Sequence, residues 1–276
     1  MADLNINWYF FSIPIGVILI GLLAYGVVKL RTNRALAEKI CYYLSWTVLI
    51  YKAFHYIIYC TVLAHPWNQQ IPCEISQITF FLCPIAYLSQ NKYVRDAGAF
   101  MGIFAGAVQV FASTVAPFSF ANSGTLVVFS FLESTIMHYF VLVIGLLEIT
   151  CVYKLKVKNG WTVYFALLLI LLWGVLASFT WRFGTDAGYP NEPANIGFVQ
   201  RCVLPAAITD HAPWLLEGHL FIIPYLMVFF VFTAAVYLVS HLAFRNREEQ
   251  EKSIYGMGWG EMHKFLNAKS NGNNQE

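Results

Sequence analysis

The hydrophobic pattern of this chain is a series of long apolar runs separated by short polar segments. A bilayer core about 30 Å thick is crossed by roughly 20 residues of α-helix, so runs of that length are candidate spans. Seven such runs lie at residues 8–28, 40–64, 71–89, 97–115, 125–153, 161–181 and 218–244. The pattern therefore predicts an all-α membrane protein with seven transmembrane helices.

Lysine and arginine in short loops resist translocation and mark the cytoplasmic side of a membrane protein. They gather after the first, third, fifth and seventh runs, at Lys29, Arg31, Arg34, Lys39, Lys92, Arg95, Lys154, Lys156, Lys158, Arg245 and Arg247. The loops on the opposite side carry only Arg182 and Arg201. We therefore expect a multi-pass protein of the cell membrane, with its N-terminus outside and its C-terminus in the cytoplasm.

These runs divide the chain into a membrane domain at residues 1–244 and a cytoplasmic tail at residues 245–276. The tail ends in the polar segment KSNGNNQE, which favours disorder over its last part. Its middle, YGMGWGEMHKF, is a candidate contact for a protein partner or for the membrane surface.

Composition narrows the class of protein further. The chain is 58% hydrophobic and 12% charged, which is about half the charge of a soluble domain. Its net charge of +2 includes no basic block, so we expect no nucleic-acid partner. Neither CxxC nor HExxH spacing occurs, so we expect no metal and no other cofactor.

Polar side chains inside the apolar runs are the candidate functional residues. A charged group at that depth costs at least a few kcal/mol unless it faces the protein interior. The polar residues of the second, third, fourth and fifth runs are Lys52, His55, Cys73, Glu74, Ser76, Gln77, Gln109, Glu133, Ser134 and His138. Several of these residues are three or four positions apart within one run, a spacing that places their side chains on one face of a helix. Counted from the outer ends of the runs, these residues all lie in the outer half of the membrane. We expect them to line one pocket open to the outside.

The residue types in this pocket suit nucleophilic catalysis. A hydroxyl or thiol becomes a useful nucleophile when a nearby base takes its proton, and histidine is the commonest such base. Ser76 or Cys73 is the candidate nucleophile, and His138 is the candidate base. The Glu133 carboxylate would orient the imidazole, as the third member of a catalytic triad does.

The remaining pocket residues have supporting roles in this interpretation. Lys52 or Gln77 would stabilise a developing oxyanion, while His55 and Ser134 would complete the pocket lining. The alternative is purely structural. Lys52 and Glu133 would then form a buried ion pair that fixes helix register, with the other polar groups satisfying hydrogen bonds.

Three segments resemble a family of small multi-span proteins, the bacterial YwaF-like proteins and their animal relatives of the transmembrane-protein-164 type. They are IPCEISQI at 71–78, GIFAGAVQVFASTVAPF at 102–118 and FLESTIMHYFVLVIGLL at 131–147. The resemblance implies a membrane-embedded acyl-transfer fold, in which a cysteine of the third span and a histidine of the fifth act on lipid acyl chains. His138 matches the histidine, whereas Ser76 stands at the expected cysteine position and Cys73 lies directly after Pro72.

The sequence leaves three functions open. The first is an acyltransferase or hydrolase that acts on the acyl chains of membrane lipids. The second is a non-catalytic subunit of a membrane complex, whose cytoplasmic tail docks a protein partner. The third is a small-solute or proton-coupled carrier that uses Lys52, His55 and Glu133.

Two further expectations concern residues outside the predicted pocket. Glu148 lies near the cytoplasmic end of the fifth run, and we interpret it as a snorkelling or paired residue at the membrane interface. Cys60, Cys73 and Cys202 are candidates to approach one another on the outer side, which leaves one disulfide open without fixing its pairing.

Overall fold

The computed structural model describes residues 9–31, 33–62, 66–72, 74–115, 125–184, 191–193 and 209–245. Within them, each of the seven predicted runs overlaps one long α-helix. These helices are α1 (Tyr9–Leu30), α2 (Arg34–Thr61), α4 (Ile75–Ser89), α5 (Lys92–Val115), α6 (Thr125–Leu147), α7 (Gly160–Thr180) and α9 (Ile222–Ala243). The short elements are α3 (Trp67–Gln70), the π-helix η1 (Glu148–Val152), and the 3-10 helices η2 (Val157–Asn159) and η4 (Pro213–His219).

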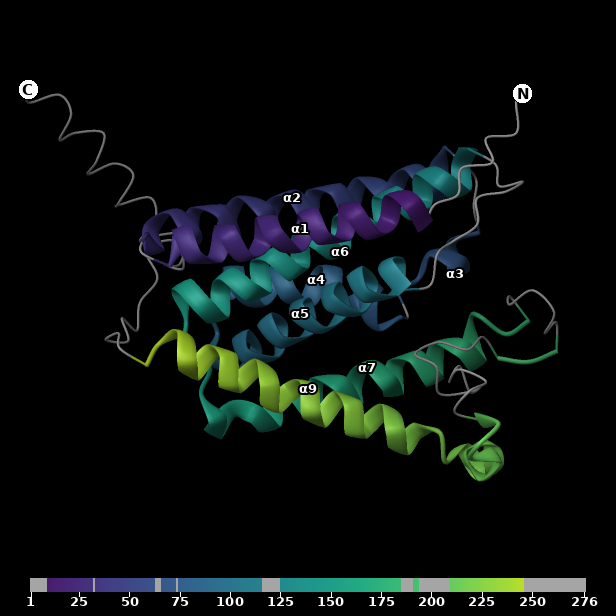
Figure 1. The fold of residues 1–276 in the computed structure, drawn as a ribbon. Coiled ribbons are helices and arrows are strands. Elements are labelled where there is room, and N and C mark those ends of the chain that lie inside the picture. Colours follow the sequence, from purple (N-terminus) through teal and green to yellow (C-terminus); the bar gives the residue numbers. More distant parts are fainter. Residues whose placement is uncertain are drawn as a thin grey trace, which may run out of the picture.

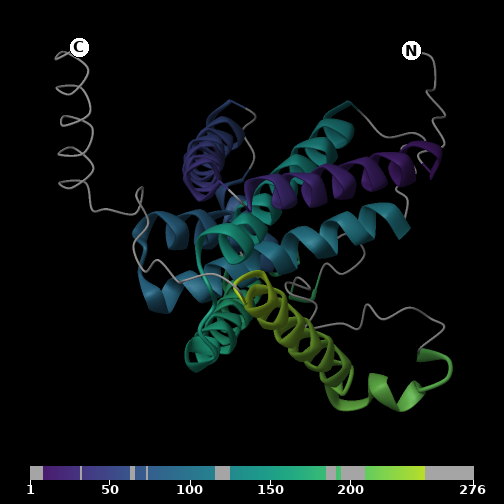
Figure 2. The ribbon, with the colours of Figure 1, turned by 60° about the vertical axis from the view of Figure 1, so that its left-hand side comes forward.

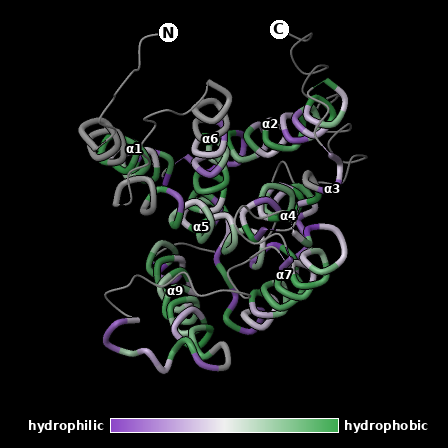
Figure 3. The backbone as a smooth tube through the Cα atoms, turned by 90° about the vertical axis from the view of Figure 1, so that its right-hand side faces the viewer, coloured by the Kyte–Doolittle hydropathy of each residue, from purple (hydrophilic) through white to green (hydrophobic). Residues whose placement is uncertain are grey.

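Three helical segments of the described chain are long and apolar enough to cross a membrane, namely Glu133–Val152, Val157–Thr180 and Ile222–Ala243. Shorter apolar helices lie at Val17–Leu30 and Ile75–Ser89. Hydrophobic residues cover most turns of α7 and α9 (Figure 3), and many of their large apolar side chains are exposed on the surface. Extensive exposed apolar surface is unfavourable in water and normal against lipid.

The long helices form three groups, and α5 lies in the middle group. Helices α1 and α2 lie on one side of α4, α5 and α6, while α7 and α9 lie on the other (Figures 1 and 2). Helix α5 contacts α4 and α6 along its length, and it also contacts α1, α7 and α9. We call the end of the bundle where α4 and α9 begin the Glu74 end, and the end where α5 begins the Lys92 end.

Glycines set the close approach of α5 to its neighbours. Gly98, Gly102 and Gly106 are four residues apart on α5, the small-residue spacing that lets membrane helices pack tightly. A Cβ atom added at Gly102 would lie 2.6 Å from the Cys83 sulfur and 2.8 Å from the Val141 carbonyl oxygen. The backbones of α4, α5 and α6 therefore approach one another more closely than larger residues permit.

We predict that Gly102→Ala destabilises the protein by about 1 to 3 kcal/mol, because the new methyl group overlaps the neighbouring helices. Gly26→Ala on α1 is the matched control, since no atom lies within 4 Å of a Cβ added there. That substitution should be neutral or stabilise by about 0.4 to 1 kcal/mol, because alanine restricts the unfolded chain. Thermal unfolding of both variants in detergent measures the difference, and equal effects would contradict the close-packing interpretation.

Candidate functional site

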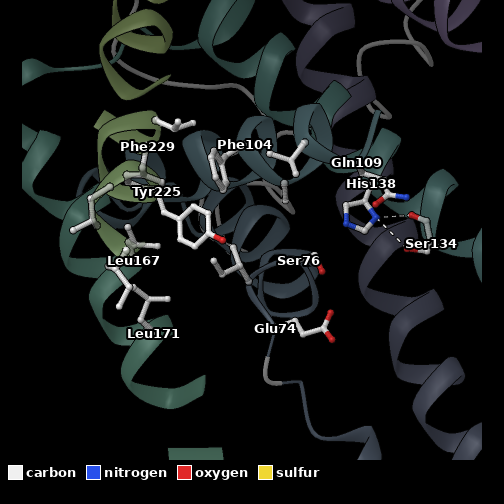
Figure 4. Close-up of a pocket in the computed structure, with 16 residues that line it drawn as sticks. Glu74, Ser76, Phe104, Gln109, Ser134, His138, Leu167, Leu171, Tyr225 and Phe229 are labelled. Atoms are coloured by element: carbon white, nitrogen blue, oxygen red, sulfur yellow. Dashed lines mark hydrogen bonds between the residues drawn. The ribbon is translucent and has the colours of Figure 1, made fainter. Parts of the chain in front are cut away.

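A cavity of about 590 Å³ lies between α4, α5, α6, α7 and α9, a volume typical of small-molecule sites. Its polar lining residues are Glu74, Ser76, Gln109, Ser134, His138 and Tyr225. The first five lie on one side of the cavity, whereas Leu167, Leu171 and Phe229 lie on the other, and the Tyr225 hydroxyl points from α9 into the space between them (Figure 4). The cavity is therefore amphipathic, with a polar wall facing an apolar wall.

The cavity also reaches the apolar surface of the bundle. Val108 of α5 and Leu226 and Val228 of α9 line it, yet these side chains are 48%, 49% and 62% exposed. A closed cavity would bury all of its lining residues, so this one is open to the surface beside these residues of α5 and α9, and also near the exposed Glu74. An apolar molecule in contact with the exposed apolar surface of the bundle can reach the cavity by this route.

His138 is the best-defined polar group of the cavity. Its side chain is 5% exposed, and its Nδ1 atom lies 2.7 Å from the backbone carbonyl oxygen of Ser134. A carbonyl oxygen only accepts hydrogen bonds, so this contact assigns the proton of neutral His138 to Nδ1. The other ring nitrogen, Nε2, points into the cavity (Figure 4) and carries the free lone pair that a general base needs.

Ser76 comes to the same cavity from the start of α4. Glu74 precedes that helix as its N-cap, and the backbone N–H of Glu74 donates to the Gln77 side-chain oxygen in a capping box. This cap fixes the first turn of α4, which carries Ser76. Ser76 and His138 thus line one cavity from separate helices. No hydrogen bond joins the Ser76 and His138 side chains in the described structure.

Glu133 has a different position from the one that we expected. Its Oε1 atom accepts a hydrogen bond of 2.7 Å from Lys52 Nζ and lies 3.3 Å from His55 Nδ1. The carboxylate does not orient His138, because the Ser134 carbonyl occupies the Nδ1 atom of that ring. This buried ionic cluster joins α2 to α6, so the predicted ion pair between Lys52 and Glu133 is present in the structure.

The two residues expected to stabilise an oxyanion, Lys52 and Gln77, do not line the cavity. The Phe80 ring contacts both Lys52 and His138, with its centroid 4.6 Å from the ammonium nitrogen and 4.8 Å from the imidazole centroid. The Gln77 oxygen instead accepts from the backbone of Glu74. Gln109 lines the cavity and is its available side-chain amide donor among the described residues.

A second buried polar cluster lies near the Lys92 end. The Arg95 guanidinium donates to Glu148 Oε1 and to Gln90 Oε1, and it stacks on the Tyr153 ring at 4.3 Å. Glu148 is 0% exposed, so it does not snorkel to the surface, and it is paired with Arg95 as one of the two expected alternatives. The sequence analysis assigned Arg95 to a cytoplasmic loop, because it lies close to other charged residues, and so missed its buried position. The apolar residues that follow it on α5 were the signal that a helix continues through this position.

Several predicted features lie outside the described residues. They include Cys73, Cys202 and the tail from residue 246, so the structure describes neither the second candidate nucleophile nor a partner-docking segment. Cys60 has a free thiol. Among the described residues, no group of three or more His, Cys, Asp or Glu side chains could hold a metal ion.

Comparison with known proteins gives one match. The chain matches the family model of the TMEM164 family over residues 5–237, which is most of its length. Searches of curated proteins and of solved structures found no match.

Proposed function

Because this chain belongs to the TMEM164 family, we propose that it is a membrane-embedded acyltransferase or hydrolase that acts on the acyl chains of lipids. The observation that supports this function best is that Ser76 and His138 face one amphipathic cavity from two helices. The membership also bears out the resemblance in the sequence, which implies acyl transfer by a nucleophile of the third span and a histidine of the fifth.

In the proposed reaction, Ser76 Oγ attacks the ester carbonyl carbon of a lipid while His138 Nε2 takes the hydroxyl proton. The bond from that carbon to the ester oxygen then breaks, and the leaving alcohol receives the proton from His138. A second alcohol or water, deprotonated in turn by His138, attacks the acyl carbonyl carbon, the bond from that carbon to Ser76 Oγ breaks, and His138 returns the proton to Oγ. The Gln109 amide would donate a hydrogen bond to the oxyanion.

The opening beside α5 and α9 supports a lipid as the substrate. A lipid can enter the cavity through this opening and bring its ester group to the polar wall. Water-soluble substrates have no comparable reason to enter from the apolar surface. We propose that the chain crosses the cell membrane seven times with its N-terminus outside, which places the Glu74 end and the polar wall towards the exterior.

The carrier function has one observation in its favour, which is the buried cluster of Lys52, His55 and Glu133. Buried ionisable groups in membrane proteins often serve proton movement. None of these three residues lines the cavity, although Lys52 and the lining residue His138 both contact the Phe80 ring. The non-catalytic alternative, with a tail that docks a partner, stays a prediction because the tail lies outside the described residues.

An assay with a radiolabelled phospholipid tests the proposed function. The purified full-length protein in phospholipid nanodiscs should release labelled fatty acid or transfer it to a lysophospholipid. Ser76→Ala should lower this turnover by at least about 100-fold, because the nucleophile is lost. Ser89→Ala, at the exposed far end of the same helix, is the matched control and should leave turnover unchanged.

The outcome also separates the two candidate nucleophiles. If Ser76→Ala retains activity and Cys73→Ala loses it, the thiol is the nucleophile and the assignment of Ser76 is wrong. If the wild-type protein neither releases nor transfers the labelled chain, although it folds in the nanodisc, the enzymatic function is rejected.

A further inference from the structure

We propose that four phenylalanines of α5 and α9, namely Phe100, Phe104, Phe229 and Phe232, close the cavity at one end and limit the length of the acyl chain that it accepts. We call these residues the phenylalanine floor. The inference rests on the proposed function for the identity of the ligand, and it adds the residues that select among ligands.

The cavity ends at the phenylalanine floor. On α5, Phe104 is the lining residue nearest to the Lys92 end, and on α9 the corresponding residue is Phe229. Leu167 has the same position on α7. The polar residues Glu74 and Ser76 lie towards the opposite end, because they begin α4. A chain whose ester group is at Ser76 would therefore run towards the Lys92 end and meet the floor.

The four rings pack against one another in two layers. Phe104 and Phe229 line the cavity with their centroids 5.1 Å apart, at an interplanar angle of 67°. Phe100 lies behind them, 4.9 Å from Phe229, and Phe232 lies 5.4 Å from Phe104. These edge-to-face contacts are favourable geometries for aromatic pairs. Phe100 is fully buried and Phe229 is 4% exposed, so the floor has dense packing behind it.

A densely packed floor would select acyl chains by their length, because the free energy of burying a chain differs little between the bilayer and the cavity. An acyl chain that leaves the bilayer for the cavity exchanges one apolar environment for another, so each added methylene gains little from burial. A chain that is too long meets the rings and moves its ester carbon away from Ser76. A chain that is too short leaves unfilled space and loses contacts. In hydrophobic pockets, one methylene too many or too few commonly changes the preference between two ligands by roughly 10- to 200-fold.

Chain binding measured without turnover tests the floor directly. Saturated fatty acids from lauric to arachidic acid would displace the fluorescent fatty acid cis-parinaric acid from the purified full-length protein. For Phe104→Ala and for Phe229→Ala, we expect the affinity ratio of longer to shorter acids to rise at least about tenfold. Phe230→Ala is the matched control, because Phe230 adjoins Phe229 but is 63% exposed and does not line the cavity.

A filling substitution tests the same inference in the other direction. Leu171→Trp enlarges a lining residue of α7 about one helical turn from Leu167, and it should shift the preference towards shorter acids. This variant keeps the test open if an alanine substitution in the floor prevents folding.

The outcomes distinguish the floor from the proposed function. If the fatty acids displace the probe from every variant with one unchanged length profile, the floor does not select and the proposed function is unaffected. If Phe230→Ala shifts the profile as strongly as Phe229→Ala, the selection does not come from the floor. If no fatty acid displaces the probe from the wild-type protein, the cavity holds no acyl chain, and both proposals are overturned.

Discussion

Replacing His138 with alanine is expected to lower lipid acyl turnover by about 100- to 10,000-fold, the range typical of a lost general base. The reason is geometric. The Ser134 carbonyl oxygen, 2.7 Å from Nδ1, directs the free lone pair of Nε2 into the cavity that Ser76 also lines. Alanine removes this acceptor without adding volume. The measurement is release or transfer of a labelled acyl chain by the purified variant in nanodiscs.

Two further variants make this result specific. His241→Ala removes an exposed histidine near the end of α9, far along the chain from the cavity residues, and should leave turnover unchanged. Ser134→Ala keeps the backbone carbonyl that holds the imidazole, so it should reduce turnover much less than His138→Ala. Turnover that survives His138→Ala in a folded protein would remove this residue from the mechanism.

Glu148→Ala is expected to destabilise the protein by about 3 to 5 kcal/mol, because it leaves the Arg95 charge buried without its anionic partner. Both side chains are almost completely buried, and Arg95 Nη2 and Glu148 Oε2 have no hydrogen-bond partner in the described structure. Gln90 Oε1, which accepts from Arg95 Nη1, is uncharged and does not replace the lost carboxylate. Thermal and denaturant-induced unfolding of the purified variant in detergent measures the change.

The control for Glu148→Ala is Glu217→Ala, which removes an exposed glutamate and should change stability by less than about 0.5 kcal/mol. The double variant Arg95→Leu/Glu148→Leu removes both charges. Its loss of stability should be about 0.5 to 3 kcal/mol smaller than the summed losses of the single variants Arg95→Leu and Glu148→Leu. Strict additivity in this double-mutant cycle would show that the two charges do not stabilise each other.

The candidate site shows where sequence spacing is informative and where it is not. Ser134 and His138 are four residues apart, so the sequence places them on one helical face, and both line the cavity. Glu133 and His138 are five residues apart, which separates them by about 140° around the helix. This angle argues against the expected triad and is consistent with the position of Glu133 towards Lys52.

The partner of each polar residue was harder to predict than its face. Lys52 and His55 share a face of α2, and both contact Glu133 as their spacing allows. Nothing in that spacing shows that Lys52 and His138 contact the same Phe80 ring. Likewise, Glu148 was recognisable as a charge in an apolar run, but its pairing with Arg95 depends on how α5 and η1 pack.

The sequence by itself determined the long helices, their apolar surfaces and the few polar residues that the interior must accommodate. These properties follow from local composition and helical periodicity, which every segment carries on its own. Only the tertiary structure decided which polar residues meet. Glycine contacts fix how closely α5 approaches α4 and α6, and the rotation of each helix then sends neighbouring side chains to different partners. Ser76 and His138 reach one cavity, while Glu133 turns to α2, because helix packing sets these directions after the helices have formed.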